Sequence, residues 1–225
     1  FELDFSNSSN LWEDVSTNIN NWTVTNIDST DQILDSPTNN FATMNPLATY
    51  YPWYAYTYSQ GNLVVWSSDN SNSLSTFSVW SGKWYGEFKI NIIGLTTKTR
   101  VWVMRYDSKT SLVTNVDSPW IAYIANGKKS IDESETTYGS TYTVGDIIWV
   151  ALNADDNEIT FYKNGVSQGI ITGMAMSSTY VFGYKDGAAS WEMSANFWQD
   201  STFAWSVSEW TYDSNAWWEF AYTPP

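Results

Sequence analysis

Lys83-Trp-Tyr-Gly-Glu-Phe-Lys-Ile90 alternates strictly between two kinds of side chain. Trp84, Phe88 and Ile90 fall on one side, and the charged residues fall on the other. Successive side chains of a β-strand point to opposite faces of its sheet, so a period of two is the pattern of a half-buried strand. This stretch therefore predicts β structure with one apolar face and one polar face.

Further short strands are predicted on both sides of this stretch. Arg100-Val-Trp-Val-Met-Arg-Tyr106 has the same character, and residues 147–152 are continuously apolar, as in a strand buried on both faces. Strands are also predicted at residues 159–162, 180–184 and 191–197. Asn164-Gly165 is a strong hairpin signal, because a type I′ turn needs positive φ at both central residues. No helical period persists over eleven residues, so we expect an all-β fold, an antiparallel β-sandwich.

Composition excludes several classes of function. The chain has 225 residues, no Cys, no His and a formal net charge of −14. A charge of this sign disfavours nucleic acid as a partner. The absence of imidazole and thiol removes Ser-His-Asp and Cys-His nucleophiles and the usual zinc ligands. No stretch is long and apolar enough for a transmembrane helix, so membrane insertion is not expected.

The charges divide the chain into three parts. All ten Lys and Arg residues lie between Lys83 and Lys185, beside ten acids. Residues 1–82 and 186–225 therefore carry the whole net charge. All twelve glycines also lie in the middle, between Gly61 and Gly187. We therefore expect a sandwich over residues 36–200. Residues 1–35 are then the end of an upstream domain or a linker, and residues 201–225 are a Trp-rich extension.

Three stretches resemble the core strands of the SPRY domain family. They are Ser81-Gly-Lys-Trp-Tyr-Gly-Glu-Phe, Gly145-Asp-Ile-Ile-Trp-Val-Ala-Leu-Asn and Ile159-Thr-Phe-Tyr-Lys-Asn-Gly-Val. The resemblance implies a concanavalin-like, jelly-roll β-sandwich that is used for binding rather than for catalysis.

Residues 35–46, 195–200 and 220–225 look like the SPRY-containing structural proteins of bacteriophages, especially marine ones. In those proteins the stretch Leu3-Asp-Phe-Ser-Asn-Ser-Ser resembles the closing strand of a preceding laminin-G-like domain. The resemblance implies a place on the virion, as part of a fibre, tail or capsid surface. The partners would be neighbouring virion proteins, further copies of the chain and a host-surface glycan.

Several tryptophans stand where these relatives carry glycine. They are Trp12, Trp198, Trp205 and either Trp217 or Trp218. Glycine at such positions indicates positive φ, which is costly for a bulky side chain. A tail with exposed tryptophans would be a large apolar liability. We therefore expect at least three of five tail tryptophans to be buried on the sandwich or on a neighbouring subunit: Trp198, Trp205, Trp210, Trp217 and Trp218.

Two acidic clusters are candidates for a catalytic or metal site. Asp132, Glu133 and Glu135, together with Asp155 and Asp156, could supply the carboxylate pair of a glycosidase. They fall in polar turn clusters, however, so solvated loop acids are the favoured interpretation. The stretch 155–158 could bind calcium, but it lacks the spacing and central Gly of an EF-hand loop, so a hairpin turn is favoured. We expect no metal, no cofactor and no enzymatic activity.

The aromatic residues are the better candidates for binding. Trp84, Trp102, Trp149 and Trp191 lie in predicted strands and should be core. Others lie in expected loops and could bind a sugar ring or a protein as exposed platforms. These candidate ligand-binding residues are Tyr51, Trp53, Tyr54, Tyr56 and Trp120. The alternative for residues 50–58 is packing over the sandwich edge or against a neighbouring subunit.

The function that these observations favour is a non-enzymatic virion structural or attachment protein. A second class stays open: a secreted carbohydrate-binding module, or a glycoside hydrolase of concanavalin-like fold.

Overall fold

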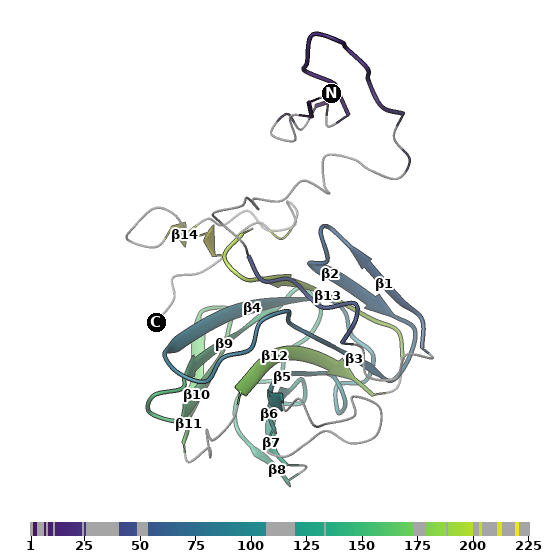
Figure 1. Ribbon diagram of the computed structural model, residues 1–225. Coiled ribbons are helices and arrows are strands. Elements are labelled where there is room, and N and C mark those ends of the chain that lie inside the picture. The colour runs from purple at the N-terminus through teal and green to yellow at the C-terminus, as the bar shows by residue number, and fades with distance from the viewer. Residues whose placement is uncertain are drawn as a thin grey trace.

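Two antiparallel sheets pack face to face in a computed structural model of the chain (Figure 1). The structure describes residues 2–3, 7, 9–10, 12–23, 25, 41–48, 54–106, 120–132, 134–172, 179–187, 189–199, 203, 211–212 and 219–220. None of these residues is helical, so the all-β sandwich that the sequence predicts is confirmed. Within the described ranges there is also no helix with the length and apolar character needed to cross a bilayer.

The first sheet has seven strands in the order β1-β2-β13-β4-β9-β10-β11. Their bounds are β1 Tyr56–Ser59, β2 Val64–Ser67, β13 Trp191–Asn196, β4 Lys83–Ile92, β9 Ile147–Asn153, β10 Glu158–Lys163 and β11 Val166–Thr172. The predicted hairpin joins β10 to β11, with φ of 47° at Asn164 and 82° at Gly165.

The second sheet has six strands in the order β3-β12-β5-β6-β7-β8. Their bounds are β3 Ser71–Leu74, β12 Thr179–Asp186, β5 Arg100–Tyr106, β6 Trp120–Ile124, β7 Lys128–Ile131 and β8 Ser134–Thr137. Every pairing in both sheets is antiparallel. Two further short strands, β14 Thr211–Tyr212 and β15 Glu219–Phe220, pair only with each other.

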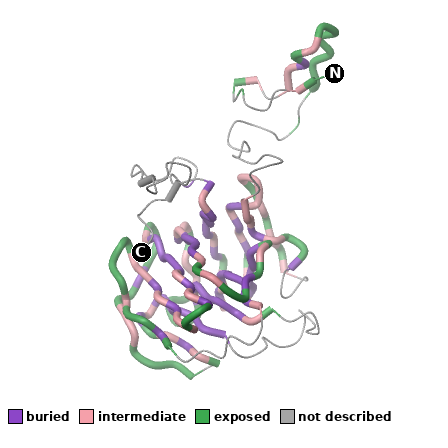
Figure 2. Tube along the Cα trace, turned by 60° about the vertical axis from the view of Figure 1, so that its left-hand side comes forward, coloured by how far each residue is buried: buried purple, intermediate pink, exposed green. Residues whose placement is uncertain are grey.

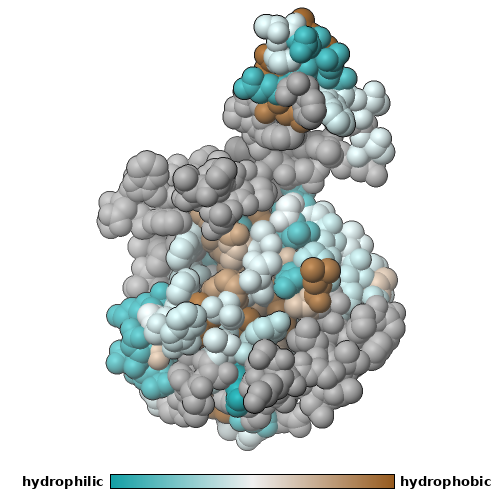
Figure 3. Space-filling view, viewed as in Figure 1, coloured by the Kyte–Doolittle hydropathy of each residue, from teal (hydrophilic) through white to brown (hydrophobic). Residues whose placement is uncertain are grey.

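The main core fills the space between the two sheets. Figure 3 shows apolar atoms near the middle of the visible face, and Figure 2 shows the central strands buried, whereas the edge strands β8 and β11 are mostly exposed. Phe88 and Ile90 of β4 lie in this core, as the alternation of that strand predicts. Strand β9 is buried on both faces, because Ile148 and Val150 face the core while Trp149 packs in a second cluster on the outer face.

Glu87 of β4 differs from the sequence expectation. It lies on the polar side of the strand as predicted, yet it is fully buried rather than solvated. Its carboxylate accepts a hydrogen bond from the Tyr85 hydroxyl at 3.0 Å and another from the Asn196 side-chain amide at 2.9 Å. A buried carboxylate needs such donors, because burial without them would cost several kcal/mol. Phe203 is buried in the neighbouring cluster on this outer face.

Strand β3 is polar and nevertheless buried along its whole length. Aromatic side chains supply its hydrogen bonds: Trp191 Nε1 donates to Ser71 Oγ at 2.8 Å, and the Asn72 amide donates to the Tyr56 hydroxyl at 3.3 Å. The Tyr58 hydroxyl lies 3.2 Å from Ser73 Oγ. Tyr56 and Tyr58 therefore tie edge strand β1 of the first sheet to edge strand β3 of the second.

The described N-terminal residues form a small unit of their own around Asp14. Its carboxylate accepts backbone hydrogen bonds from Glu2 at 2.9 Å, Ser16 at 2.9 Å and Asn20 at 2.8 Å. Leu3 forms an isolated bridge with Asp14. The expectation that residues 1–35 end an upstream domain stays a prediction.

Candidate functional site

The outer face of the second sheet carries an apolar cluster of its own. It contains Ala48, Leu74, Trp102, Met104, Trp120, Ala122 and Val181, all buried. Strand β5 therefore has two apolar faces, since Val101 and Val103 point into the main core while Trp102 and Met104 point the other way. The sequence prediction of one polar face for this strand is wrong at these positions.

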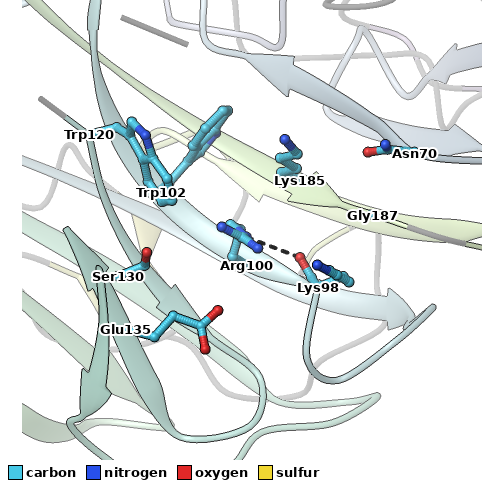
Figure 4. Close-up of a pocket in the computed structure, with 9 residues that line it drawn as sticks. All are labelled: Asn70, Lys98, Arg100, Trp102, Trp120, Ser130, Glu135, Lys185 and Gly187. Carbon is cyan, nitrogen blue, oxygen red and sulfur yellow. Dashed lines mark hydrogen bonds between the residues drawn. The ribbon is translucent and has the colours of Figure 1, made fainter. Parts of the chain in front are cut away.

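A cavity of about 390 Å³ opens over this outer face. Its lining comes from five neighbouring strands, β12, β5, β6, β7 and β8, and from residues next to strand ends: Asn70, Lys98, Arg100, Trp102, Trp120, Ser130, Glu135, Lys185 and Gly187. Figure 4 shows the two tryptophans at one side of the cavity and Arg100 between Lys185 and Glu135. The volume lies within the range of about 300–1,000 Å³ that is typical of ligand sites.

Strand register explains why the two tryptophans line the cavity. Trp102 lies opposite Gly183 on one side and Ala122 on the other, and both neighbours are small enough to leave room for the indole. A Cβ at position 183 would overlap Trp102 Nε1 and would lie 2.7 Å from the Ser73 carbonyl oxygen. The ring of Trp120 meets that of Trp102 edge to face, with centroids 5.8 Å apart.

Three cations line the cavity, and two of them lie over the tryptophan rings. The Arg100 guanidinium lies 5.4 Å from the centroid of the Trp120 ring, and Lys185 Nζ lies 5.8 Å from that of the Trp102 ring. Both distances suit cation–π attraction. Arg100 and Lys185 are also direct partners across β5 and β12, and like charges in that position destabilise a sheet. The strands thus hold positive charge at the cavity at a cost to the fold.

Buried polar atoms of the lining also lack partners. Trp102 Nε1, Ser130 Oγ and Asn70 Oδ1 have no hydrogen-bond partner in the part of the chain that the structure describes. Trp102 and Ser130 are each only 1% exposed. The one acid of the lining, Glu135, pairs with Lys128 at 3.2 Å. The lining of the cavity therefore combines three cations with buried polar atoms that have no partner among the described residues.

The five predicted ligand-binding residues do not form one surface. Trp120 lines the cavity, but it is the first residue of β6 and only 6% exposed, so its predicted place in an exposed loop is wrong. Tyr56 lies in edge strand β1 and packs over the sandwich edge, which is the alternative that the sequence left open. Tyr54 is partly buried just before β1. Tyr51 and Trp53 lie outside the described residues, and ligand binding by all five stays a prediction.

The loop acids have structural roles. The Asp155 carboxylate accepts the Gly82 amide at 2.8 Å, and the Asp156 carboxylate accepts the Asn153 side-chain amide at 2.7 Å. This is the β9–β10 turn that the sequence favours at residues 155–158. Asp132 accepts the backbone amide of Trp120 at 2.9 Å. Among the described residues, no three acidic side chains gather in a group that could hold a metal ion.

Sequence reasoning missed most of the cavity. Trp102 was expected in the core, and it is buried, but on the outer face. Lys98, Arg100, Ser130 and Lys185 carried no signal of their own, because only strand register brings them together. The unbroken apolar run from Val101 to Met104, directly after Arg100, was the one local hint that both faces of this strand are covered.

Residues 83–184 match the family model for the SPRY domain. No curated protein matches the chain. Such a domain is generally a non-catalytic module for protein–protein interaction.

Solved structures with the same fold agree with this match. The SPRY domain of human HERC1 superposes with a TM-score of 0.56 at 18% identity, covering 68% of this chain and 96% of that one. Stonustoxin gives a TM-score of 0.53 at 15% identity, over 70% of this chain and 27% of that chain. The PSpry domain of TRIM65 gives 0.51 at 10% identity, over 70% and 90%. Residues 83–184 are therefore similar in sequence to a SPRY domain, and the whole sandwich shares the fold of these structures.

Proposed function

We propose that this chain is a non-enzymatic interaction protein of a phage virion, and that it holds a segment of a neighbouring protein in the cavity on the outer face of its second sheet. The observation that carries the proposal is this cavity, where the buried Trp102 and Trp120 lie beside three cations on a SPRY sandwich. Arginine is among the residues that most often dominate protein–protein binding when a partner covers them.

The place on the virion rests on the resemblance of residues 35–46, 195–200 and 220–225 to phage structural proteins. The division of charge supports an assembled state, because residues 1–82 and 186–225 contain no Lys or Arg and carry the net charge of −14. Other virion proteins and further copies of the chain are the proposed partners, on the surface of the extracellular particle.

Labelling of particles tests this proposal. Particles purified from the native source are imaged by negative-stain electron microscopy with an antibody against the sandwich. Label at fixed positions on fibres, tails or capsids is the expected result. Recovery of the chain only in the soluble fraction, with label absent from particles, overturns the virion role and favours the secreted carbohydrate-binding alternative.

A further inference from the structure

A second cavity lies on the outer face of the first sheet, over the neighbouring strands β1, β2, β13 and β4 (Figure 1). Its volume is about 520 Å³, within the range that is typical of ligand sites. The polar part of its lining includes Ser59, Lys89, Asn91, Glu192 and Ser194. We call this cavity the first-sheet pocket. It shares no residue with the cavity on the second sheet.

Strand register brings the polar side chains of the first-sheet pocket together. Lys89 of β4 lies directly opposite Ser194 of β13. Across the next two strands, Ser194 lies opposite Val64 of β2, and Val64 lies opposite Ser59 of β1. Asn91 and Glu192, each two residues away on the same strands, line the same pocket. Four strands that are distant in sequence thus contribute to one polar surface.

The polar side chains form a hydrogen-bonded chain and leave free groups beside it. Lys89 Nζ donates to Asn91 Oδ1 at 3.0 Å, and Asn91 Nδ2 donates to Ser194 Oγ at 2.8 Å. An ammonium group has three N–H donors, so Lys89 keeps donors for an occupant. The Glu192 carboxylate and the Ser59 hydroxyl have no hydrogen-bond partner among the described residues. Glu192 is partly exposed and Ser59 is exposed, so an occupant can reach both.

The first-sheet pocket has no net charge at neutral pH. Lys89 and Glu192 are the charged residues of its lining, and their charges cancel. Burial lowers the pKa of Lys89, and the negative charge of Glu192 opposes that shift. A simple anion or cation would be attracted by one of these groups and repelled by the other. Hydrogen bonding rather than charge must therefore select the ligand.

We propose that the first-sheet pocket binds a neutral sugar, whose hydroxyl groups donate to Glu192, accept from Lys89 and bond to Ser59. A hydroxyl is both a donor and an acceptor, so adjacent hydroxyls of one sugar can serve the carboxylate and the ammonium together. Val144 and Val64 also line the pocket, and Val144 is 52% exposed, so the C–H groups of the ring have an apolar surface to contact. The proposal does not depend on a place on the virion.

A peptide fits the first-sheet pocket less well. A peptide strand adds to a sheet through backbone hydrogen bonds at an open edge, whereas β13 is paired on both sides, with β2 and β4. Proteins are most often anchored by large aromatic side chains that a partner covers. Of the described lining, only Phe203 is aromatic, and it is 4% exposed. A free amino acid, which carries both charges, is the alternative that the experiment must separate from a sugar.

Saturation-transfer NMR of the full chain tests the proposal with the methyl glycosides of glucose, galactose, mannose and N-acetylglucosamine. We expect at least one of them to bind with a dissociation constant below about 10 mM. Lys89→Gln, Glu192→Gln and Ser59→Ala should each weaken that glycoside, the first two about tenfold. Two matched variants on the same sheet should leave its affinity unchanged: Glu158→Gln, a partly exposed acid of β10, and Thr57→Ala, an exposed residue of β1.

A second readout places the sugar in the first-sheet pocket. The side-chain amide resonances of Asn91, assigned by their loss in Asn91→Ala, should shift when the bound glycoside is added. Circular dichroism of each variant checks that it is folded.

Three results would overturn the sugar assignment. One is the absence of binding by all four glycosides up to about 10 mM. Another is an equal loss of affinity in Glu192→Gln and Glu158→Gln, which would place the sugar elsewhere on the protein. The third is tighter binding of free glycine, with the same shift of the Asn91 resonances, which would assign the pocket to zwitterions. None of these results changes where the antibody labels the particle, so the virion proposal fails or stands separately.

Discussion

Trp198 holds a backbone conformation that suits glycine. Its φ is 88°, in agreement with the positive φ that the sequence predicts at this position. Its amide donates to Asn196 Oδ1 at 2.9 Å, and its ring packs against the cluster formed by Tyr85, Trp149 and their neighbours. A non-glycine residue in this region of φ costs about 1–3 kcal/mol, so the packing of the ring offsets strain in the backbone.

Two substitutions separate the strain from the packing. Trp198→Ala and Trp198→Gly both remove the indole, but only the Ala variant has a Cβ that is strained at this positive φ. We expect the Gly variant to be the more stable of the two by about 1 kcal/mol in urea unfolding. At Trp80, which is 70% exposed and has ordinary φ, the order should reverse, because Gly there only adds disorder to the unfolded chain. The same order at both positions would contradict the strain at Trp198.

Gly183 gives a second prediction at this scale. Gly183→Ala forces a Cβ onto Trp102 Nε1 and the Ser73 carbonyl oxygen, so we expect unfolding free energy to fall by about 1–3 kcal/mol. Gly86→Ala is the comparison, because the atoms nearest to a Cβ there belong to the rings of Phe182 and Phe197 at 3.0–3.2 Å, a milder overlap that should cost less. Equal losses in the two variants would show that the position of Trp102 is not the limiting contact.

The pairing of β5 with β12 brings two like charges together, and a double-mutant cycle measures the effect. Arg100→Gln and Lys185→Gln each remove a cation–π contact as well as the repulsion. The double variant should be less stable than the sum of the single effects predicts, by about 0.2–1 kcal/mol, because that sum counts the relief of one repulsion twice. Added salt should reduce this coupling.

Lys128→Gln and Glu135→Gln form the comparison cycle, because those side chains attract at 3.2 Å and should give coupling of opposite sign. Coupling of the same sign in both cycles would be inconsistent with repulsion between Arg100 and Lys185.

A strand could be predicted from the sequence where its own residues show the apolar pattern of a buried strand. Strands β4, β5, β9, β10, β12 and β13 have apolar alternation or unbroken apolar runs, and each was predicted close to its observed bounds. Strand β3 was not, because Ser71-Asn-Ser-Leu74 is mostly polar. Its buried polar groups are satisfied by residues outside the strand: Trp191, 120 residues away, donates to Ser71, and the Tyr56 hydroxyl accepts from the Asn72 backbone N–H. The cavity was missed for the same reason, since strand register alone places Lys185 beside Arg100.

For the molecule as a whole, buried tyrosines set the response to alkaline pH. Burial raises the pKa of Tyr56 to about 12 and that of Tyr138 to about 12. Burial also raises the pKa of Tyr142 and of Tyr184 well above the usual value of 10. In the unfolded chain these hydroxyls ionise near pH 10, whereas in the fold they stay neutral. The stability they contribute is therefore fully present below pH 10 and is lost as the pH rises from 10 towards 12.

Urea unfolding across this range checks the prediction. We expect the midpoint to be level between about pH 6 and 9, because the chain has no His or Cys to titrate there. It should then fall steeply above pH 10, together with the rise in tyrosinate absorbance. A marked fall between pH 6 and 9 would contradict this account.

The edge-to-face pair at the cavity also has an optical consequence. Trp102 and Trp120 have ring centroids 5.8 Å apart and planes inclined by 72°. Indoles this close and this oblique share their electronic excitations, and an asymmetric pair of coupled chromophores absorbs left and right circularly polarised light with bands of opposite sign. The pair therefore acts as an intrinsic label at the base of the cavity. Any occupant that tilts one ring would change the size of the two bands, without a dye or a tag.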